Sequence, residues 1–220
     1  MVRQAFEKEL QALHAEIIRM GSLVEAAISG AVTALENMDL PLARAIMAGD
    51  DAIDGMERQI ERHCLEIILR QQPVARDLRD VTSALKLITD LERIADHAVD
   101  ISEKILLIAA SGKVMIPHHL VSMASISRGM IRGALDAYIG RDEALAAEVV
   151  RNDDQVDDLY LRIKDDLIHL IKVDRDHVES LTELLLVAKY FERIADHATN
   201  VAEWVVFTIR GDHPDLETAT

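Results

Sequence analysis

The chain has 220 residues, of which half are hydrophobic and 3% aromatic, and its 39 acids against 24 bases give a formal net charge of −15. This length can bury a substantial core, as one large domain or two small ones. The acidic balance repels phosphate backbones and no basic cluster offsets it, so we expect no direct nucleic-acid binding. One cysteine, Cys64, excludes an internal disulfide. The N-terminal stretch MVRQAFEKEL has acids where a secretory signal needs an apolar core, so we expect a soluble, cytoplasmic protein.

Helices are predicted along almost the whole chain. Ala, Leu, Ile, Glu, Asp and Arg dominate the composition, and the four prolines fall where the apolar periodicity lapses. Apolar residues spaced three and four apart predict an all-α fold of six long helices, over about 3–38, 42–70, 76–110, 119–139, 142–172 and 177–210.

The helices fall into two related halves. The string ERIADHA occurs at 92–98 and again at 192–198, and an offset of 103 pairs GDDAID at 49 with NDDQVD at 152. We therefore predict two tandem, pseudo-symmetric three-helix bundles, 1–111 and 112–220, the second with a short C-terminal tail. Short connections make successive helices antiparallel, and the lack of a Gly/Ser-rich or Pro-rich linker predicts that the halves pack on each other. Gly129 and Gly133 form a GxxxG motif, which we interpret as close helix packing.

The repeated string carries a stripe of carboxylates. Glu92, Asp96 and Asp100 recur every four residues and so lie along one stripe of a helix, where like charges repel. The second copy repeats the pattern with Glu192 and Asp196, but its third position is Asn200.

Further acids lie at the same depth on the preceding helix. Counted from the turn near Pro73, Asp50 and Asp54 lie about as far before it as Glu92 and Asp96 lie after it. An antiparallel hairpin therefore places the two pairs side by side.

The second half repeats this arrangement. Asp153 and Asp157 stand in the same relation to Glu192 and Asp196, counted from the turn near Asp174. We predict four converging acids in each half.

Clustered oxygen ligands suit divalent or ferric ions, because the cation offsets the repulsion among them. We therefore predict one metal site per half, which could accept iron, zinc, manganese or magnesium. We expect the second site to hold metal more weakly or to hold fewer ions, because Asn200 replaces the acid that Asp100 provides. His97 and His197 point about 100° from the neighbouring acids, so we interpret each as a surface or supporting histidine rather than a ligand.

Two alternatives to a non-catalytic metal site remain. The acids could form solvated faces paired with Arg58, Arg93 and Arg193. A carboxylate-bridged metalloenzyme is the other alternative, although no Glu has His three residues on, so the Glu-x-x-His pair of di-iron bundles is missing. No nucleophile, Gly-rich loop or CxxC motif indicates an enzyme.

Three stretches follow the patterns of a known family: QQPVARDLR at 71–79, ITDLERIADHAVDISEK at 88–104 and ERIADHATNVAEWVVFTIRG at 192–211. They resemble the PhoU family of phosphate-signalling regulators. The resemblance covers about residues 2–213. It implies two tandem three-helix bundles that hold iron or zinc clusters on repeated E(D)xxxD motifs. The metal ligands it implies are Glu92, Asp96, Glu192 and Asp196, with Asp100 and Asn200 continuing the stripe. The hairpin geometry adds four predicted ligands, namely Asp50, Asp54, Asp153 and Asp157.

The resemblance also implies a function and partners. The expected function is that of a non-enzymatic cytoplasmic adaptor between the ATPase subunit of a phosphate ABC transporter and a sensor histidine kinase. It would hold the phosphate-starvation response off when phosphate is plentiful, and would meet the membrane only through its partners. We also expect a homodimer. An accessory protein of a different phosphate or ion transporter would have the same fold.

Overall fold

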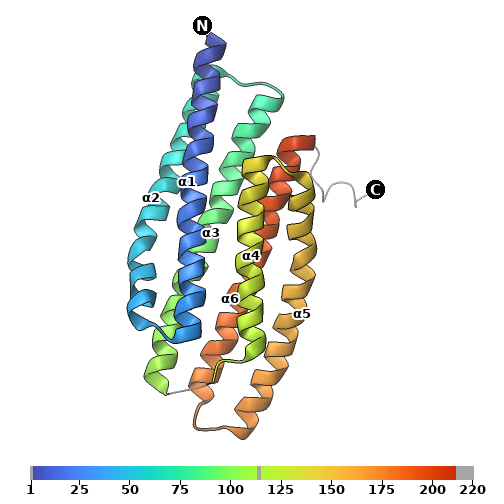
Figure 1. The fold of residues 1–220 in the computed structure, drawn as a ribbon. Coiled ribbons are helices and arrows are strands. Elements are labelled where there is room, and N and C mark those ends of the chain that lie inside the picture. The colour runs from blue at the N-terminus through green and yellow to red at the C-terminus, as the bar shows by residue number, and fades with distance from the viewer. Residues whose placement is uncertain (1, 113–114, 212–220) are drawn as a thin grey trace.

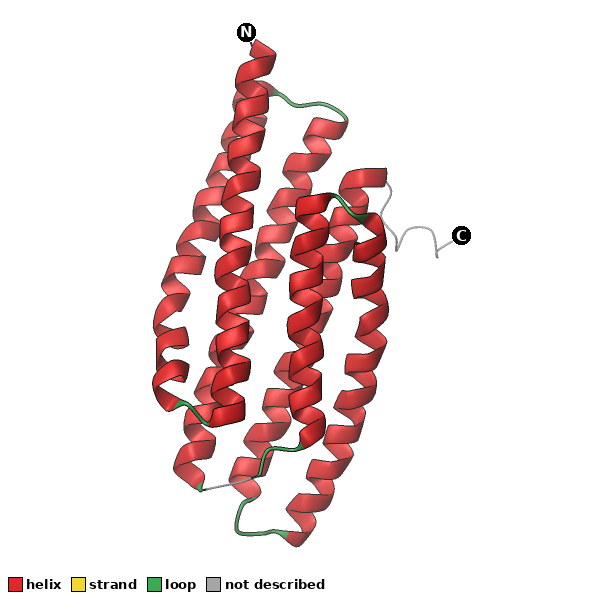
Figure 2. Ribbon diagram, in the orientation of Figure 1, coloured by secondary structure: helices red, strands yellow, loops and turns green. Residues whose placement is uncertain are grey.

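The structure is a computed structural model that describes residues 2–112 and 115–211. The described residues form six helices and no strand, which confirms the predicted all-α fold (Figures 1 and 2). The tail predicted at the C-terminus lies outside the described residues from 212 onward. The helices are α1 (Val2–Asn37), α2 (Leu40–Gln71), α3 (Arg76–Ser111), α4 (His118–Gly140), α5 (Glu143–Val173) and α6 (Val178–Arg210).

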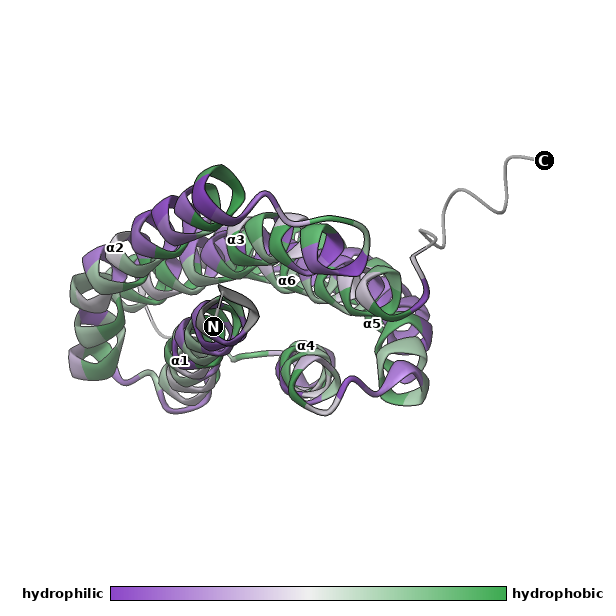
Figure 3. Cartoon of the chain, turned by 90° about the horizontal axis from the view of Figure 1, so that it is seen from above, coloured by the Kyte–Doolittle hydropathy of each residue, from purple (hydrophilic) through white to green (hydrophobic). Residues whose placement is uncertain are grey.

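The helices form two antiparallel three-helix bundles that lie against each other. α1 to α3 make the first bundle and α4 to α6 the second (Figure 1). α3 packs on α6 and α1 packs on α4, so each half contributes two helices to the junction. Seen from above, α2, α3, α6 and α5 form one curved row, with α1 and α4 side by side along its inner face (Figure 3).

The second helix of each bundle begins with the same kind of cap. Asp39 accepts a hydrogen bond from the backbone N–H of Leu42, 3.0 Å away, and Asp142 accepts from those of Ala144 and Leu145. An aspartate at this position satisfies amides that the first turn leaves without partners. Each cap precedes its acid pair by the same number of residues, so both pairs enter at the same depth in their bundles.

One apolar core runs through both halves. It joins side chains such as Ile17 of α1, Leu87 of α3 and Phe191 of α6, each at most 1% exposed. The halves therefore pack on each other, as the missing linker predicted. Within the part of the chain that the structure describes, only α1, over Phe6–Asn37, is long and apolar enough to span a membrane. In this fold its apolar stripe, including Met20 and Ile28, faces the core.

Candidate metal centres

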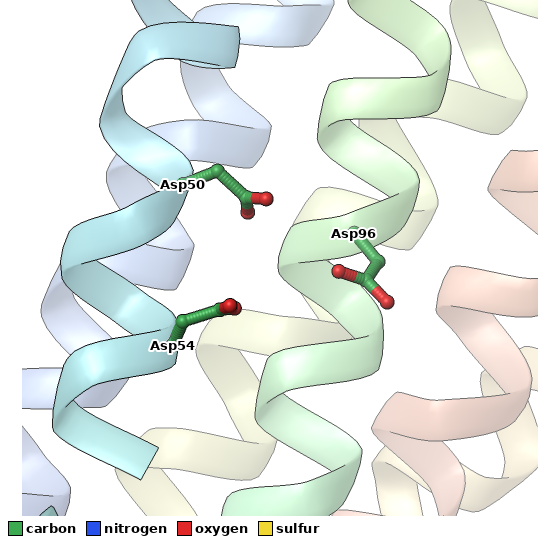
Figure 4. Close-up of side chains that lie close together, drawn as sticks. All are labelled: Asp50, Asp54 and Asp96. Carbon is green, nitrogen blue, oxygen red and sulfur yellow. The ribbon is translucent and has the colours of Figure 1, made fainter. Parts of the chain in front are cut away.

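The first acid cluster lies between α2 and α3. Asp50 and Asp54 project from successive turns of α2 toward Asp96 of α3 (Figure 4). One carboxylate oxygen from each of the three lies within 4.8 Å of the others, and all three residues are half-buried. Within the described ranges, no other three acidic, histidine or cysteine residues meet this closely. Counting depth along the hairpin correctly predicted that Asp50 and Asp54 meet Asp96, whereas Glu92, the fourth acid predicted, is not part of this group.

This donor set fits a cation. Carboxylate oxygens bind hard cations at about 2.0 to 2.6 Å, so ligands on opposite sides of one ion are about 4 to 5 Å apart. The oxygens of Asp50, Asp54 and Asp96 are already within that span. Burial raises the pKa of Asp50, and the carboxylates of Asp54 and Asp96 raise it further. The side chains are thus held close together at an electrostatic cost that a bound cation would offset.

Glu92 lies beside the trio. Burial raises the pKa of Glu92, Asp96 raises it further, and Arg93 acts in the opposite direction. Arg93 lies 3.1 Å from Asp96 and 3.5 Å from Glu92, and Arg58 lies 3.6 Å from Asp54. These are the salt bridges of the solvated-face alternative. Both arginines are more than half exposed, however, and exposed pairs of this kind contribute about 0 to 1 kcal/mol each.

Glu57 is a further acid that the sequence reasoning missed. Burial raises its pKa, and Glu61 and Asp54 add to the rise. Glu57 also raises the pKa of Glu92 across the hairpin. The available signal was its place three residues after Asp54, on the same helical stripe. The first cluster therefore has a fifth carboxylate within electrostatic reach.

The second cluster lies between α5 and α6. Burial, together with Asp196 and Asp157, raises the pKa of Asp153 to about 6. Glu192 also contributes to that rise. Among the described residues no three of these acids bring their oxygens within 4.8 Å of one another, so the four converging acids predicted for this half are less close than the first trio. Asp157 and Asp196 are exposed, whereas the trio of the first half is half-buried.

A lysine enters the second cluster and has no counterpart in the first. Lys189 Nζ donates to the Glu192 carboxylate and lies 5.3 Å from the centroid of the Tyr160 ring. Burial and Glu192 raise the pKa values of Asp157 and Asp196, and Lys189 opposes the rise in both. The first half has Thr89 at the matching place, three residues before the Glu of ERIADHA. Lys189 thus gives the second cluster a cation that the first cluster lacks at the matching position.

Asp100 and Asn200, predicted to continue the acidic stripes, make their contacts elsewhere. Asp100 Oδ2 lies 3.1 Å from His97 Nδ1, and Asn200 donates to Asp90 at 3.1 Å. Asp100 lies eight residues after Glu92, and Asn200 lies eight after Glu192. Eight residues rotate a side chain by about 80° around the helix axis, so both side chains lie toward the contact between α3 and α6 rather than in the clusters. Their role as metal ligands stays a prediction.

The histidines belong to the same junction. His97 is 8% exposed, and its ring stacks on that of Tyr190. The prediction of a surface position for His97 is therefore wrong, because this part of α3 packs against the other half. Burial lowers the pKa of His97, whereas its bond to Asp100 acts in the opposite direction. His197 lies 2.8 Å from Asp90, so both histidines help to join the halves.

The fold and the clusters together define a tandem helical-repeat protein with a cluster of acids between the second and third helices of each repeat. A sequence model of the PhoU domain matches residues 17–105 and 120–205. The chain belongs to the PhoU family.

Named relatives cover nearly the full chain. The phosphate-specific transport system accessory protein PhoU homolog of Clostridium acetobutylicum is 42% identical over 98% of this chain and 99% of its own. The homolog in Caulobacter vibrioides is 35% identical over 95% of this chain and 91% of its own.

Two crystal structures are similar to the present one. PhoU from Pseudomonas aeruginosa, 34% identical, superposes with a TM-score of 0.90 over 94% of this chain and 100% of that one. The phosphate transport system regulatory protein PhoU from Streptococcus pneumoniae, 28% identical, gives 0.87 over 94% and 98%.

Proposed function

We propose that the protein is a cytoplasmic regulator of phosphate uptake and of phosphate-starvation signalling. It would act as an adaptor between the ATPase subunit of a phosphate ABC transporter and a sensor histidine kinase, and repress the response when phosphate is plentiful. The observation that carries this is the family match in both halves, with full-length relatives named as accessory proteins of phosphate-specific transport. The proposal includes no enzymatic reaction. A homodimer remains part of the expectation.

The acid clusters would hold metal ions as structural and regulatory elements. In the first half Asp50, Asp54 and Asp96 would supply oxygen ligands, with Glu92 and Glu57 beside them. A cation there neutralises mutually repelling carboxylates and links α2 to α3. It would thereby fix the outer surface of the repeat, which is the part available to a partner. Iron or zinc is the expected metal, and manganese or magnesium would also suit oxygen ligands.

The second cluster would bind metal more weakly than the first. The sequence suggested the missing acid at Asn200 as the reason. The structure supports a different one, because the Lys189 ammonium already neutralises part of the charge around Glu192. A metal ion entering there must displace or approach a fixed positive charge.

The test is co-purification of the transporter ATPase subunit and of the kinase with tagged protein. A double variant, Asp54→Asn with Asp96→Asn, should reduce recovery of at least one partner and lower the metal content. The matched control is Asp165→Asn with Glu148→Gln, which removes the same charge from exposed positions on α5. Recovery of neither partner by the unmodified protein would refute the adaptor. Unchanged recovery with the metal gone would refute the metal's part in it.

A further inference from the structure

A groove between α1 and α4 has a chemistry unlike the rest of this acidic molecule. The two helices lie side by side (Figure 3) and carry none of the clustered acids. The groove encloses about 330 Å³ and is lined by Glu25 and Ser29 from α1 and by Ser125, Arg128, Gly129 and Arg132 from α4.

The two arginines of the groove are weakly engaged. Arg128 is half-buried and makes no ion pair with any residue that the structure describes. Arg132 is 72% exposed, and its Nε lies 4.0 Å from Glu25 and 3.9 Å from Asp136. Those distances are at the outer limit of an ion pair. Two arginines one helical turn apart therefore line the groove without a close ion-pair partner.

The serines of the groove are also free to donate. Elsewhere on these helices, Ser22, Thr33 and Ser127 donate to the carbonyl four residues earlier, at 2.8 to 3.0 Å. The hydroxyls of Ser29 and Ser125 make no hydrogen bond within the described part of the chain. Hydroxyl donors next to arginine are well suited to the oxygens of an anion.

Gly129 keeps the wall of the groove open. The GxxxG motif was interpreted as close helix packing, and Gly133 fits, because a Cβ there would meet Val149 at 2.9 Å. For Gly129 that interpretation was wrong, since nothing lies within 4 Å of the place where its Cβ would be. A glycine inside a helix lowers its stability, and the bare backbone lets a ligand approach closely.

We propose that this groove binds a phosphoryl oxyanion, either free phosphate or the phosphate group of a larger molecule. Arg128 and Arg132 neutralise its charge, and the hydroxyls of Ser29 and Ser125 donate to its oxygens. Glu25 gives selectivity. A carboxylate can only accept, so it favours an anion that still carries a P–O–H donor and repels fully ionised sulfate.

The test uses full-length protein freed of metal with a chelator, so that phosphate cannot bind through a metal ion. Isothermal titration at about pH 5, below the second pKa of a phosphate ester (about 6), keeps a P–O–H donor on both phosphate and AMP. Under these conditions titration with inorganic phosphate, AMP and sulfate should show one phosphoryl ligand per chain and weak or no sulfate binding. Arg128→Gln should weaken binding at least about tenfold, which corresponds to loss of a charge-assisted hydrogen bond. Glu25→Gln should bring the affinity for sulfate close to that for phosphate.

Two further variants control for folding. Gly129→Leu should fill the groove and abolish binding with the helical circular dichroism unchanged. Arg162→Gln, an exposed arginine of α5, should have no effect on binding.

The outcomes separate the sources of the ligand. Binding of phosphate without AMP identifies free phosphate as the ligand, and binding of AMP alone identifies a phosphate ester. Binding of both identifies the phosphoryl group that the two ligands share. No binding of either by the unmodified protein, or equal binding after Arg128→Gln with Arg132→Gln, would overturn the proposal. Metal content and recovery of the transporter ATPase are measured independently of phosphate binding. A failure of the phosphate-binding proposal is therefore distinguishable from a failure of the proposed function.

Discussion

Lys189 offers the sharpest test of why the two acid clusters differ. Replacing it with threonine, the residue at the matching position 89, removes the internal cation of the second cluster and should tighten metal binding there. Opposite unit charges close together near a protein surface attract by about 4 kcal/mol at an effective dielectric constant of about 20. Because Lys189 is 39% and Glu192 15% exposed, solvent screening reduces this to about 1 to 2 kcal/mol. The expected gain in affinity is therefore about tenfold.

The assay must read the second cluster alone. Asp54→Asn with Asp96→Asn disables the first cluster, and zinc affinity is then measured by competition with a fluorescent chelator, with and without Lys189→Thr. Lys172→Thr, at an exposed lysine of α5, is the charge-matched control. In the reverse experiment, Thr89→Lys in the otherwise intact protein should weaken the first cluster. Unchanged or weaker zinc binding after Lys189→Thr would refute the reasoning.

Three further predictions concern stability. The pKa of Asp153 in the folded protein, about 6, exceeds the ordinary value of 3.8, so ionisation of this carboxyl opposes folding. The melting temperature of metal-free protein should therefore fall as the pH rises from about 4 to about 6, and Asp153→Asn should flatten this dependence. An unchanged slope in the variant would count against the prediction. Asp142→Ala removes the acceptor for two amides and should lower the free energy of unfolding by about 1 kcal/mol in urea titrations; no loss would show that the cap is dispensable. Gly129→Ala should raise the free energy of unfolding by up to about 1 kcal/mol, because the new Cβ enters open space. Gly133→Ala should raise it less or lower it, because the new Cβ meets Val149. Equal effects of the two variants would contradict the packing described here.

Much of the fold could be predicted because its signals are local. Apolar spacing and the placement of four prolines located six helices to within a few residues. The meeting of Asp50 and Asp54 with Asp96 followed from counting residues on either side of one turn. That inference needs only the rise per residue of a helix and an antiparallel hairpin, so it does not depend on how the side chains pack.

The rest depended on how the halves pack, which periodicity does not reveal. Asp100 and His97 lie on the same helix as Asp96, and only the position of α6 turns them into junction residues. Lys189 was not singled out, although its place three residues before Glu192 on α6 is the spacing of a helical ion pair. Only the packing of α5 against α6 places it over the Tyr160 ring. The groove between α1 and α4 is lined by residues about one hundred positions apart, such as Glu25 and Arg132. No local sequence pattern predicts that these residues lie close together.

The central claim is that the acid clusters hold metal, and the first most firmly. Elemental analysis of protein purified without a chelator or a metal-affinity tag tests it most directly. We predict at least about one ion per chain, with a larger loss from Asp54→Asn and Asp96→Asn than from Asp153→Asn and Asp196→Asn. A content far below one ion per chain, or equal losses from the two double variants, would contradict the account.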